Sequence, residues 1–174
     1  IGVSVRPCFL HGDAMLAGVD GAFNALSIYG DALGHSLYYG AGAGRTPTAS
    51  AVVSDILNVA SGWYPHAFKT MQLTPDHHEP ASLIPQEDLI SRAYVRINAM
   101  DLPGAMAQVT KVLADHQISI SAVSQHERNE GQYVPVVVLT HEARQGDLKT
   151  ATEKIESLEC IDGKPVVIRI IDLA

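Results

Sequence analysis

The chain of 174 residues carries 12 Lys and Arg side chains against 19 Asp and Glu side chains, a formal net charge of -7 at pH 7. This balance argues against a general nucleic-acid binder, because such a protein needs a cationic surface that neutralises phosphates. The longest uncharged stretches hold 13 residues, fewer than the roughly 18 that cross a bilayer, so neither a transmembrane helix nor a membrane partner is expected.

The amino end and the cysteines predict the cellular setting. No charged segment followed by an apolar one, as in a secretory signal, stands at the amino end. Cys8 and Cys160 are too few for a disulfide framework, so a reduced, cytoplasmic setting is expected. Because the chain begins at Ile1 rather than Met, we expect that a segment precedes it.

The first part of the chain reads as short strands with little charge. Segments 2–10, 22–29 and 36–39 are predicted strands, with a turn at 31–34. Nine of the 14 glycines lie within the first 44 residues, and residues 1–89 carry only 3 basic and 8 acidic side chains. A surface that is rich in glycine and poor in charge is not well suited to face solvent, so we expect it to lie against other protein or a ligand.

A glycine-rich turn, residues 40–44, leads into a predicted helix. Thr46 is the expected N-cap and Pro47 the expected first helical residue. The helix is expected to stop at Gly62.

This turn invites a dinucleotide-binding interpretation, since bare backbone allows a cofactor to approach closely. Arg45, however, occupies the place of the third glycine of G-x-G-x-x-G counted from Gly40, and no acidic ribose ligand follows about 20 residues later. A self-contained Rossmann unit is therefore not predicted. The turn could still close over a cofactor that is bound mainly elsewhere.

Residues 65–89 are the predicted linker between 1–64 and 90–174. Proline at this density blocks helices and central strands, and the prolines of the stretch are Pro65, Pro75, Pro80 and Pro85. The neighbouring His77 and His78 suggest a metal, but adjacent side chains rarely converge on one ion and no partner stands at zinc-like spacing. A solvated loop is the favoured interpretation, and no metal site is predicted.

The second part of the chain alternates between strand and helix patterns. Segment 91–100 alternates as a half-buried strand. A helix that ends near His116 follows, and its apolar residues recur at helical spacing. The residues expected to face the core are Ala93, Val95, Ile97 and Ala99 on the strand and Met106, Val109 and Leu113 on the helix.

A hairpin, a second helix and a last strand complete this part. Segments 118–127 and 133–140 are the predicted hairpin, although Pro135 favours an edge position or a bulge for the second strand. The last strand is predicted at 165–171. The apolar face of the second helix is expected to consist of Leu148, Ala151, Ile155 and Leu158. The order strand, helix, strand, strand, helix, strand is that of ferredoxin-like βαββαβ folds, so the fold class is α+β.

Segment 101–125, DLPGAMAQVTKVLADHQISISAVSQ, resembles the opening of an ACT domain. This small regulatory module binds amino acids in biosynthetic enzymes, and the resemblance covers essentially all of 90–174. In that family a ligand typically lies at an interface between two modules, near the loop that joins the first strand to the first helix. Homo-oligomers that form through ACT domains, dimers or larger, are therefore expected.

The ACT resemblance implies an effector site. Asp101 would hold the ammonium group, and the backbone around Ala105 and Met106 would hold the carboxylate, because amides at a helix start suit an anion. Ser119 and Ile120 would face the same cleft. Two alternatives stay open: Asp101 only caps its helix, and the module serves only for association. Gln125 and His126 are interpreted as exposed strand positions.

Residues 19–56 resemble the carboxyl end of the catalytic domain of homoserine dehydrogenase. The motifs that carry this resemblance are the NA of Asn24-Ala25, the GD of Gly30-Asp31, the GAGAG of 40–44 and the PTASAV of 47–52. An ACT domain directly after this region is also the layout of the bacterial monofunctional enzymes. The α+β chain would thus hold a partial α/β catalytic-domain tail, of strands plus one helix, before its ACT domain.

This second resemblance implies an activity. Family members interconvert L-aspartate 4-semialdehyde and L-homoserine with NAD or NADP in threonine and methionine biosynthesis, and L-threonine commonly inhibits them. Gly44 would approach the nicotinamide, with Thr48 and Ala49 nearby at the helix start. A non-catalytic ACT module for amino-acid sensing or dimerisation is the alternative.

No catalytic residue is expected in this chain. The family's Rossmann domain, catalytic lysine and substrate-binding carboxylates belong upstream of the matched segment. Lys69 lies in the predicted linker, and Asp20, Asp31 and Asp55 match no catalytic position. We therefore expect the chain alone to have no dehydrogenase activity.

Overall fold

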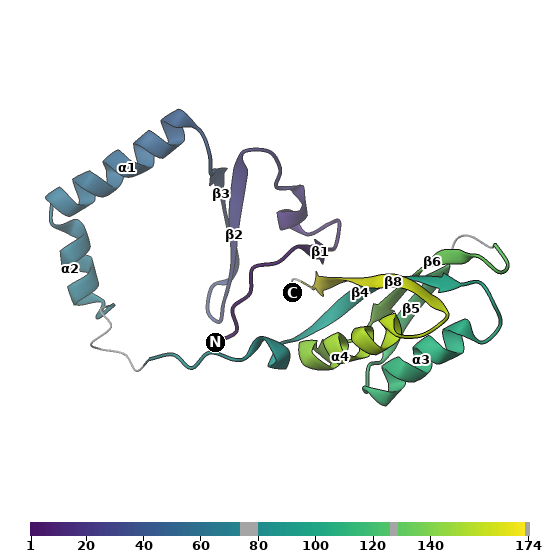
Figure 1. Cartoon of the computed structure of the whole chain (residues 1–174). Coiled ribbons are helices and arrows are strands. Elements are labelled where there is room, and N and C mark those ends of the chain that lie inside the picture. The colour runs from purple at the N-terminus through teal and green to yellow at the C-terminus, as the bar shows by residue number, and fades with distance from the viewer. Residues whose placement is uncertain (74–79, 126–128, 173–174) are drawn as a thin grey trace. The chain divides into compact units, whose positions relative to one another are not determined.

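The computed structural model describes residues 1–73, 80–125 and 129–172. It divides into two compact units, one formed by Ile1–His11 with Ser82–Ala174 and one formed by Gly12–Ala81 (Figure 1). His77, His78 and His126, which were considered above, lie outside the described residues. None of the helices in these described ranges is long and apolar enough to cross a membrane.

The first unit is built on a sheet with strand order β1-β8-β4-β6-β5. Its central strand, β4, is antiparallel to both neighbours, and α3 and α4 pack on one face (Figure 1). The predicted βαββαβ order is confirmed. Its elements are β4 (Ile90–Met100), α3 (Ala105–Asp115), β5 (Ile120–Gln125), β6 (Tyr133–Thr140), α4 (Gln145–Glu156) and β8 (Ile161–Ile171), with a short β7 (Ala143–Arg144) paired to the start of β4.

The core of this unit forms where the predicted apolar faces meet. The four residues expected on β4 are each at most 2 % exposed. On α3 the buried residues are Ala105, Val109 and Leu113, while Met106 is only partly buried against the same core. Because helix residues spaced by four lie on one face, Ala105 and Val109 follow the stripe better than Met106 does. On α4 the core residues are Leu148, Ala151 and Ile155.

Strand β6 lies inside the sheet, between β4 and β5, rather than at an edge as Pro135 had suggested. Pro135 pairs with Asn98 of β4. Within the described residues, the register with β5 runs from Thr140 to Val136.

Strand β1 (Cys8–Leu10) is shorter than the predicted strand 2–10, and it belongs to the sheet of the first unit. It runs parallel to β8, with Cys8 opposite Arg169. The Phe9 ring packs edge-on against Tyr94 at 5.1 Å. Residues 1–11 therefore pack with 82–172 rather than with the rest of the expected unit 1–64. The outer edge of β8 gains main-chain partners that would otherwise be missing.

The second unit consists of a hairpin and two helices. The hairpin pairs β2 (Phe23–Gly30) with β3 (Gly34–Ala41), as predicted. The helices are α1 (Arg45–Ala60) and α2 (Trp63–Thr70), and a 3-10 helix covers Met15–Gly18. Helix α2 was not predicted. Pro65 is its third residue, where the missing N–H lacks an intrahelical partner in any case.

No described residue of this second unit is buried. Its exposed large apolar side chains follow both strands and both helices. They include Leu26, Ile28, Tyr38, Val52, Ile56, Leu57 and Trp63, each at least 44 % exposed. Apolar surface of this extent is typical of a face that other protein covers.

Candidate functional site

The glycine-rich turn after β3 is folded against the start of β2. The amide of Gly42 donates to the Ala22 carbonyl at 2.9 Å. A Cβ atom on Gly42 would lie 1.8 Å from the Asn24 side-chain nitrogen. A side chain at this position would therefore force the Asn24 carboxamide to move.

Gly44, rather than the predicted Thr46, is the N-cap of α1. Its φ of 131° is a conformation that favours glycine, and its carbonyl accepts the Thr48 amide at 3.0 Å. The helix thus begins two residues earlier than the threonine signal suggested. No acidic side chain stands in its first turn, so nothing there opposes an anionic or polar ligand group.

The three residues assigned to the cofactor by resemblance lie side by side. Gly44, Thr48 and Ala49 line one open hollow, together with Arg45, Val52 and Val53. The hollow thus combines bare backbone, one cation and a largely apolar wall. This chemistry suits a flat, polar-edged ring approached from the helix start.

Asp101 does not cap α3, so that alternative is wrong. The N-cap is Gly104, with φ of 93° and no side-chain hydrogen bond. The Asp101 carboxylate instead accepts the Asn129 amide at 2.8 Å and the Gln125 side-chain amide at 3.1 Å. Its backbone amide also donates to the Gln132 carbonyl at 2.8 Å. Asp101 thereby ties the end of β4 to the β5–β6 connection.

The start of α3 offers one of the two expected backbone groups. The Ala105 amide already donates to the Leu102 carbonyl at 3.2 Å, and Ala105 itself is buried. The Met106 amide is the next one along the first turn, where N–H groups lack intrahelical partners. It is the better donor for a carboxylate.

Ser119 and Ile120 lie at the start of β5, whereas Asp101 contacts the end of that strand. Ile120 begins β5, whereas Gln125, which contacts Asp101, ends it. A strand of six residues separates the two ends by about 16 Å. The expected cleft shared by Ser119, Ile120 and Asp101 stays a prediction, and within one chain these residues lie at opposite ends of β5.

One further ion pair links two elements of the first unit. Asp88 accepts a hydrogen bond from Arg144, and this bond and the Asp88 charge raise the pKa of Arg144 above its ordinary value. The pair joins the 3-10 helix Gln86–Asp88 to the start of α4. Within the described ranges, no group of three or more His, Cys, Asp or Glu side chains could hold a metal.

Two polar partners were missed by sequence reasoning. Gln125 was interpreted as a merely exposed strand residue, yet it bonds to Asp101. Asn129 was assigned only to a turn, and its backbone amide is what Asp101 accepts. No local pattern marks either contact, because both join residues more than 20 positions apart.

Comparisons with known proteins find two family models in the expected order. The model of homoserine dehydrogenase matches residues 1–57, and that of the ACT domain matches residues 93–160. The chain is 35% identical over 169 residues to a homoserine dehydrogenase of Neisseria gonorrhoeae and 36% identical over 174 residues to one of Pseudomonas aeruginosa. Each match covers 95% of this chain and 39% of the relative.

A solved structure extends this similarity to three dimensions. A homoserine dehydrogenase from Thiobacillus denitrificans matches 99% of this chain with a TM-score of 0.85 and 37% identity, and 39% of that protein is covered. The chain thus spans about two fifths of the length of the relatives that it matches, in their carboxyl-terminal portion.

Proposed function

The chain belongs to the homoserine dehydrogenase family, whose carboxyl-terminal portion it matches, and we propose that it is the regulatory part of an enzyme that interconverts L-aspartate 4-semialdehyde and L-homoserine with NADH or NADPH. The observation that carries this proposal is the succession of the two family models along one chain. We also propose that this enzyme is cytoplasmic and that it acts in threonine and methionine biosynthesis.

The exposed apolar surface of the second unit supports a role as part of a larger catalytic domain. Elements without any buried residue are stable only when other protein covers them. We therefore expect no dehydrogenase activity from the 174-residue chain alone. Reduction of NAD or NADP in the presence of L-homoserine, followed by absorbance, tests this, and turnover by the purified chain would contradict it.

The hollow at the start of α1 is proposed to receive the nicotinamide end of the cofactor. Gly44 would let the ring approach the backbone, and Thr48 and Ala49 would contact it from the first turn of the helix. The rest of the cofactor would be bound by protein outside this chain, which would also set the preference between NAD and NADP.

The loop between β4 and α3 is proposed to bind an amino-acid effector, L-threonine. An ionised carboxylate has about four acceptor sites, and the contacts of Asp101 with described residues use two of them, which leaves capacity there for an ammonium group. The Met106 amide would hold the effector's carboxylate. Threonine inhibition of the complete enzyme would follow from this binding.

A second copy of the chain would complete that site. Strand β5 is an edge strand, and antiparallel pairing of two such edges about a two-fold axis sets the start of one strand beside the end of the other. Ser119 and Ile120 of one copy would then lie near Asp101 of the other. This arrangement reconciles the separation within one chain with a shared site, and it supports a dimer or larger oligomer.

Titration calorimetry of the chain with L-threonine tests the effector proposal. We expect saturable heat with L-threonine and none with D-threonine. The absence of heat with any amino acid, beside a stable dimer in sedimentation, would instead favour a module that serves only for association.

A further inference from the structure

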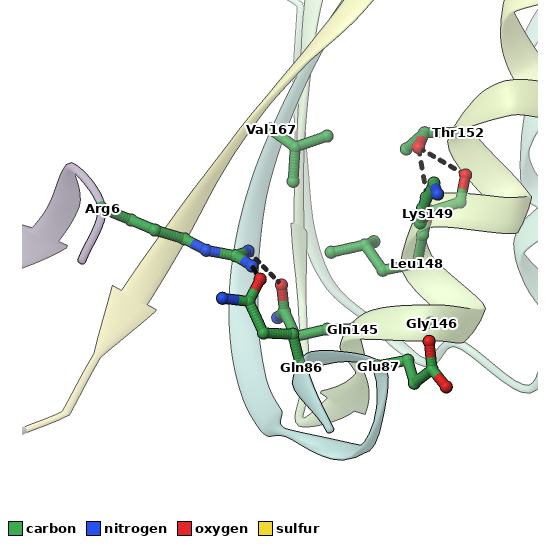
Figure 2. A pocket seen from close by; sticks show the side chains of 9 residues that line it. All are labelled: Arg6, Gln86, Glu87, Gln145, Gly146, Leu148, Lys149, Thr152 and Val167. Atoms are coloured by element: carbon green, nitrogen blue, oxygen red, sulfur yellow. Dashed lines mark hydrogen bonds between the residues drawn. The ribbon is translucent and has the colours of Figure 1, made fainter. Parts of the chain in front are cut away.

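A cavity of about 430 Å³ opens in the first unit where the segment before β1 meets the start of α4 (Figure 2). Its Arg6 end lies near the beginning of β4, because Gln145, which accepts from Arg6, also donates to Ser91. Asp101 follows the last residue of that 11-residue strand, so it is about 30 Å from the Arg6 end along the sheet. The lining residues with polar side chains are Arg6, Gln86, Glu87, Gln145, Lys149 and Thr152.

Arg6 holds a charge that no carboxylate neutralises within the described residues. Its Nη1 donates to the Gln145 side-chain oxygen at 3.3 Å, and its Nη2 donates to that of Gln86. Figure 2 shows the guanidinium reaching between these two neutral carboxamides. Gln145 is itself fixed, because its Nε2 donates to Ser91 at 2.7 Å. Of the five guanidinium N–H donors two are used, so three remain for a ligand.

The charges around the cavity favour an anion, in contrast to the chain as a whole. Arg6 and Lys149 stand against the single carboxylate of Glu87, whereas the chain carries a net charge of -7. Figure 2 shows the Glu87 side chain at the Gly146 end, away from the guanidinium. Lys149 approaches Glu153 only at 3.9 Å.

The remaining wall is apolar in character. Leu148 is 2 % exposed and Val167 lies across from it. The Thr152 hydroxyl donates to the carbonyls of Leu148 and Lys149, both at 2.9 Å, so this donor is already used. A ligand that fits these surroundings has a short aliphatic body behind its anionic group.

We propose that this cavity binds a small organic carboxylate, anchored on Arg6 and separate from the effector loop at Asp101. The planar fork of a guanidinium matches a carboxylate in geometry as well as in charge. Because Arg6 belongs to the segment that carries β1, a bound carboxylate would hold that segment against α4. The site would thus couple residues 1–11 to the ACT domain.

Succinate is the probe for this site, titrated calorimetrically into the 174-residue chain, with succinamide as the neutral analogue. We expect saturable binding of succinate and none of succinamide. Arg6→Gln should weaken succinate at least tenfold. Arg96→Gln, which removes an exposed arginine of β4 outside the cavity, should change it less than twofold.

A second variant tests the cavity independently, in case Arg6→Gln does not fold. Val167→Phe fills the cavity from a residue that is 41 % exposed and leaves Arg6 in place, so it should also weaken succinate at least tenfold. Equal succinate affinity in the parent chain, Arg6→Gln and Val167→Phe would overturn the proposal. Tighter binding of inorganic phosphate than of succinate would overturn the assignment to a carboxylate, and loss of succinate binding in Asp101→Asn would overturn the separation of the two sites.

Discussion

The Asp101 carboxylate accepts the backbone amide of Asn129 at 2.8 Å, and this contact holds the end of β4 to the turn before β6. The same carboxylate accepts the Gln125 side-chain amide at 3.1 Å. Asp101 is thus oriented by protein donors before any ligand arrives. A carboxylate that is already positioned loses little side-chain freedom when it binds an ammonium group.

Asp101→Asn separates this structural role from the charge. The asparagine oxygen can accept from Asn129, and its NH₂ can donate to Gln125 after that amide turns over, so both hydrogen bonds survive. We expect the melting temperature to change little and the affinity for L-threonine, measured by calorimetry, to fall at least tenfold. Asp115→Asn, an exposed position of α3 paired with Lys111, is the control. An unchanged affinity in Asp101→Asn would remove Asp101 from the site.

A substitution on strand β5 tests whether the effector site is shared between two copies of the chain. Val123 on this edge strand is 47 % exposed, and a lysine there should block pairing of two edges. We expect Val123→Lys to weaken L-threonine binding at least tenfold and to shift sedimentation toward smaller species. Val166→Lys on β8, at 38 % exposure, should do neither. Full threonine binding by Val123→Lys would argue for a site complete within one chain.

The ACT fold was predictable from the sequence because its elements repeat at simple periods. The alternation from Ala93 to Ala99 and the helical spacing of Val109 and Leu113 each place one face in the core. The pairing of β1 with β8 was not predictable, since it joins Cys8 to Arg169 with no local signal. The effector loop was predictable only in part. Asp101 matches a common helix-capping residue, but the N-cap of α3 is Gly104.

The glycine turn can be tested in the longer enzyme of which we propose this chain to be a part. Gly44→Ala would place a Cβ 3.3 Å from the Pro47 ring at a φ of 131°, so the turn must shift. We expect the KM for the nicotinamide cofactor to rise about tenfold, on the order of 1.4 kcal/mol of binding. Gly30→Ala meets only an ordinary contact, 3.8 Å from the Leu33 Cβ, and serves as the control. Equal cofactor KM values in the two variants would speak against the proposed hollow.

Leu113 tests the core of the first unit. It is 1 % exposed beneath the sheet, and its truncation leaves a cavity among rigid neighbours. We expect Leu113→Ala to lower the free energy of unfolding in urea by about 2–5 kcal/mol. Leu102→Ala, at 46 % exposure, should lower it by less than about 0.5 kcal/mol. A loss below 1 kcal/mol for Leu113→Ala would mean that α3 is not packed as described.

Thr140 carries a polar contact inside the core. Its side chain is fully buried, and its Oγ1 accepts a hydrogen bond from the backbone amide of Ala93 at 3.0 Å. Thr140 itself pairs with Ile120 of β5. Thr140→Val keeps the shape but leaves that amide without an acceptor. Because an unpaired buried amide bears its full desolvation cost, we expect a loss of about 1–3 kcal/mol in urea unfolding.

The matched control for Thr140→Val lies on an exposed helix face. The Thr150 hydroxyl donates to the Gly146 carbonyl at 3.0 Å, and water can replace it there. Thr150→Val should therefore cost less than about 0.5 kcal/mol. Amide hydrogen exchange at Ala93 adds a local readout, since faster exchange in Thr140→Val than in Thr150→Val would follow directly from the lost acceptor. Equal stabilities and equal exchange in the two variants would show that the hydroxyl contributes nothing to the β4–β6 pairing.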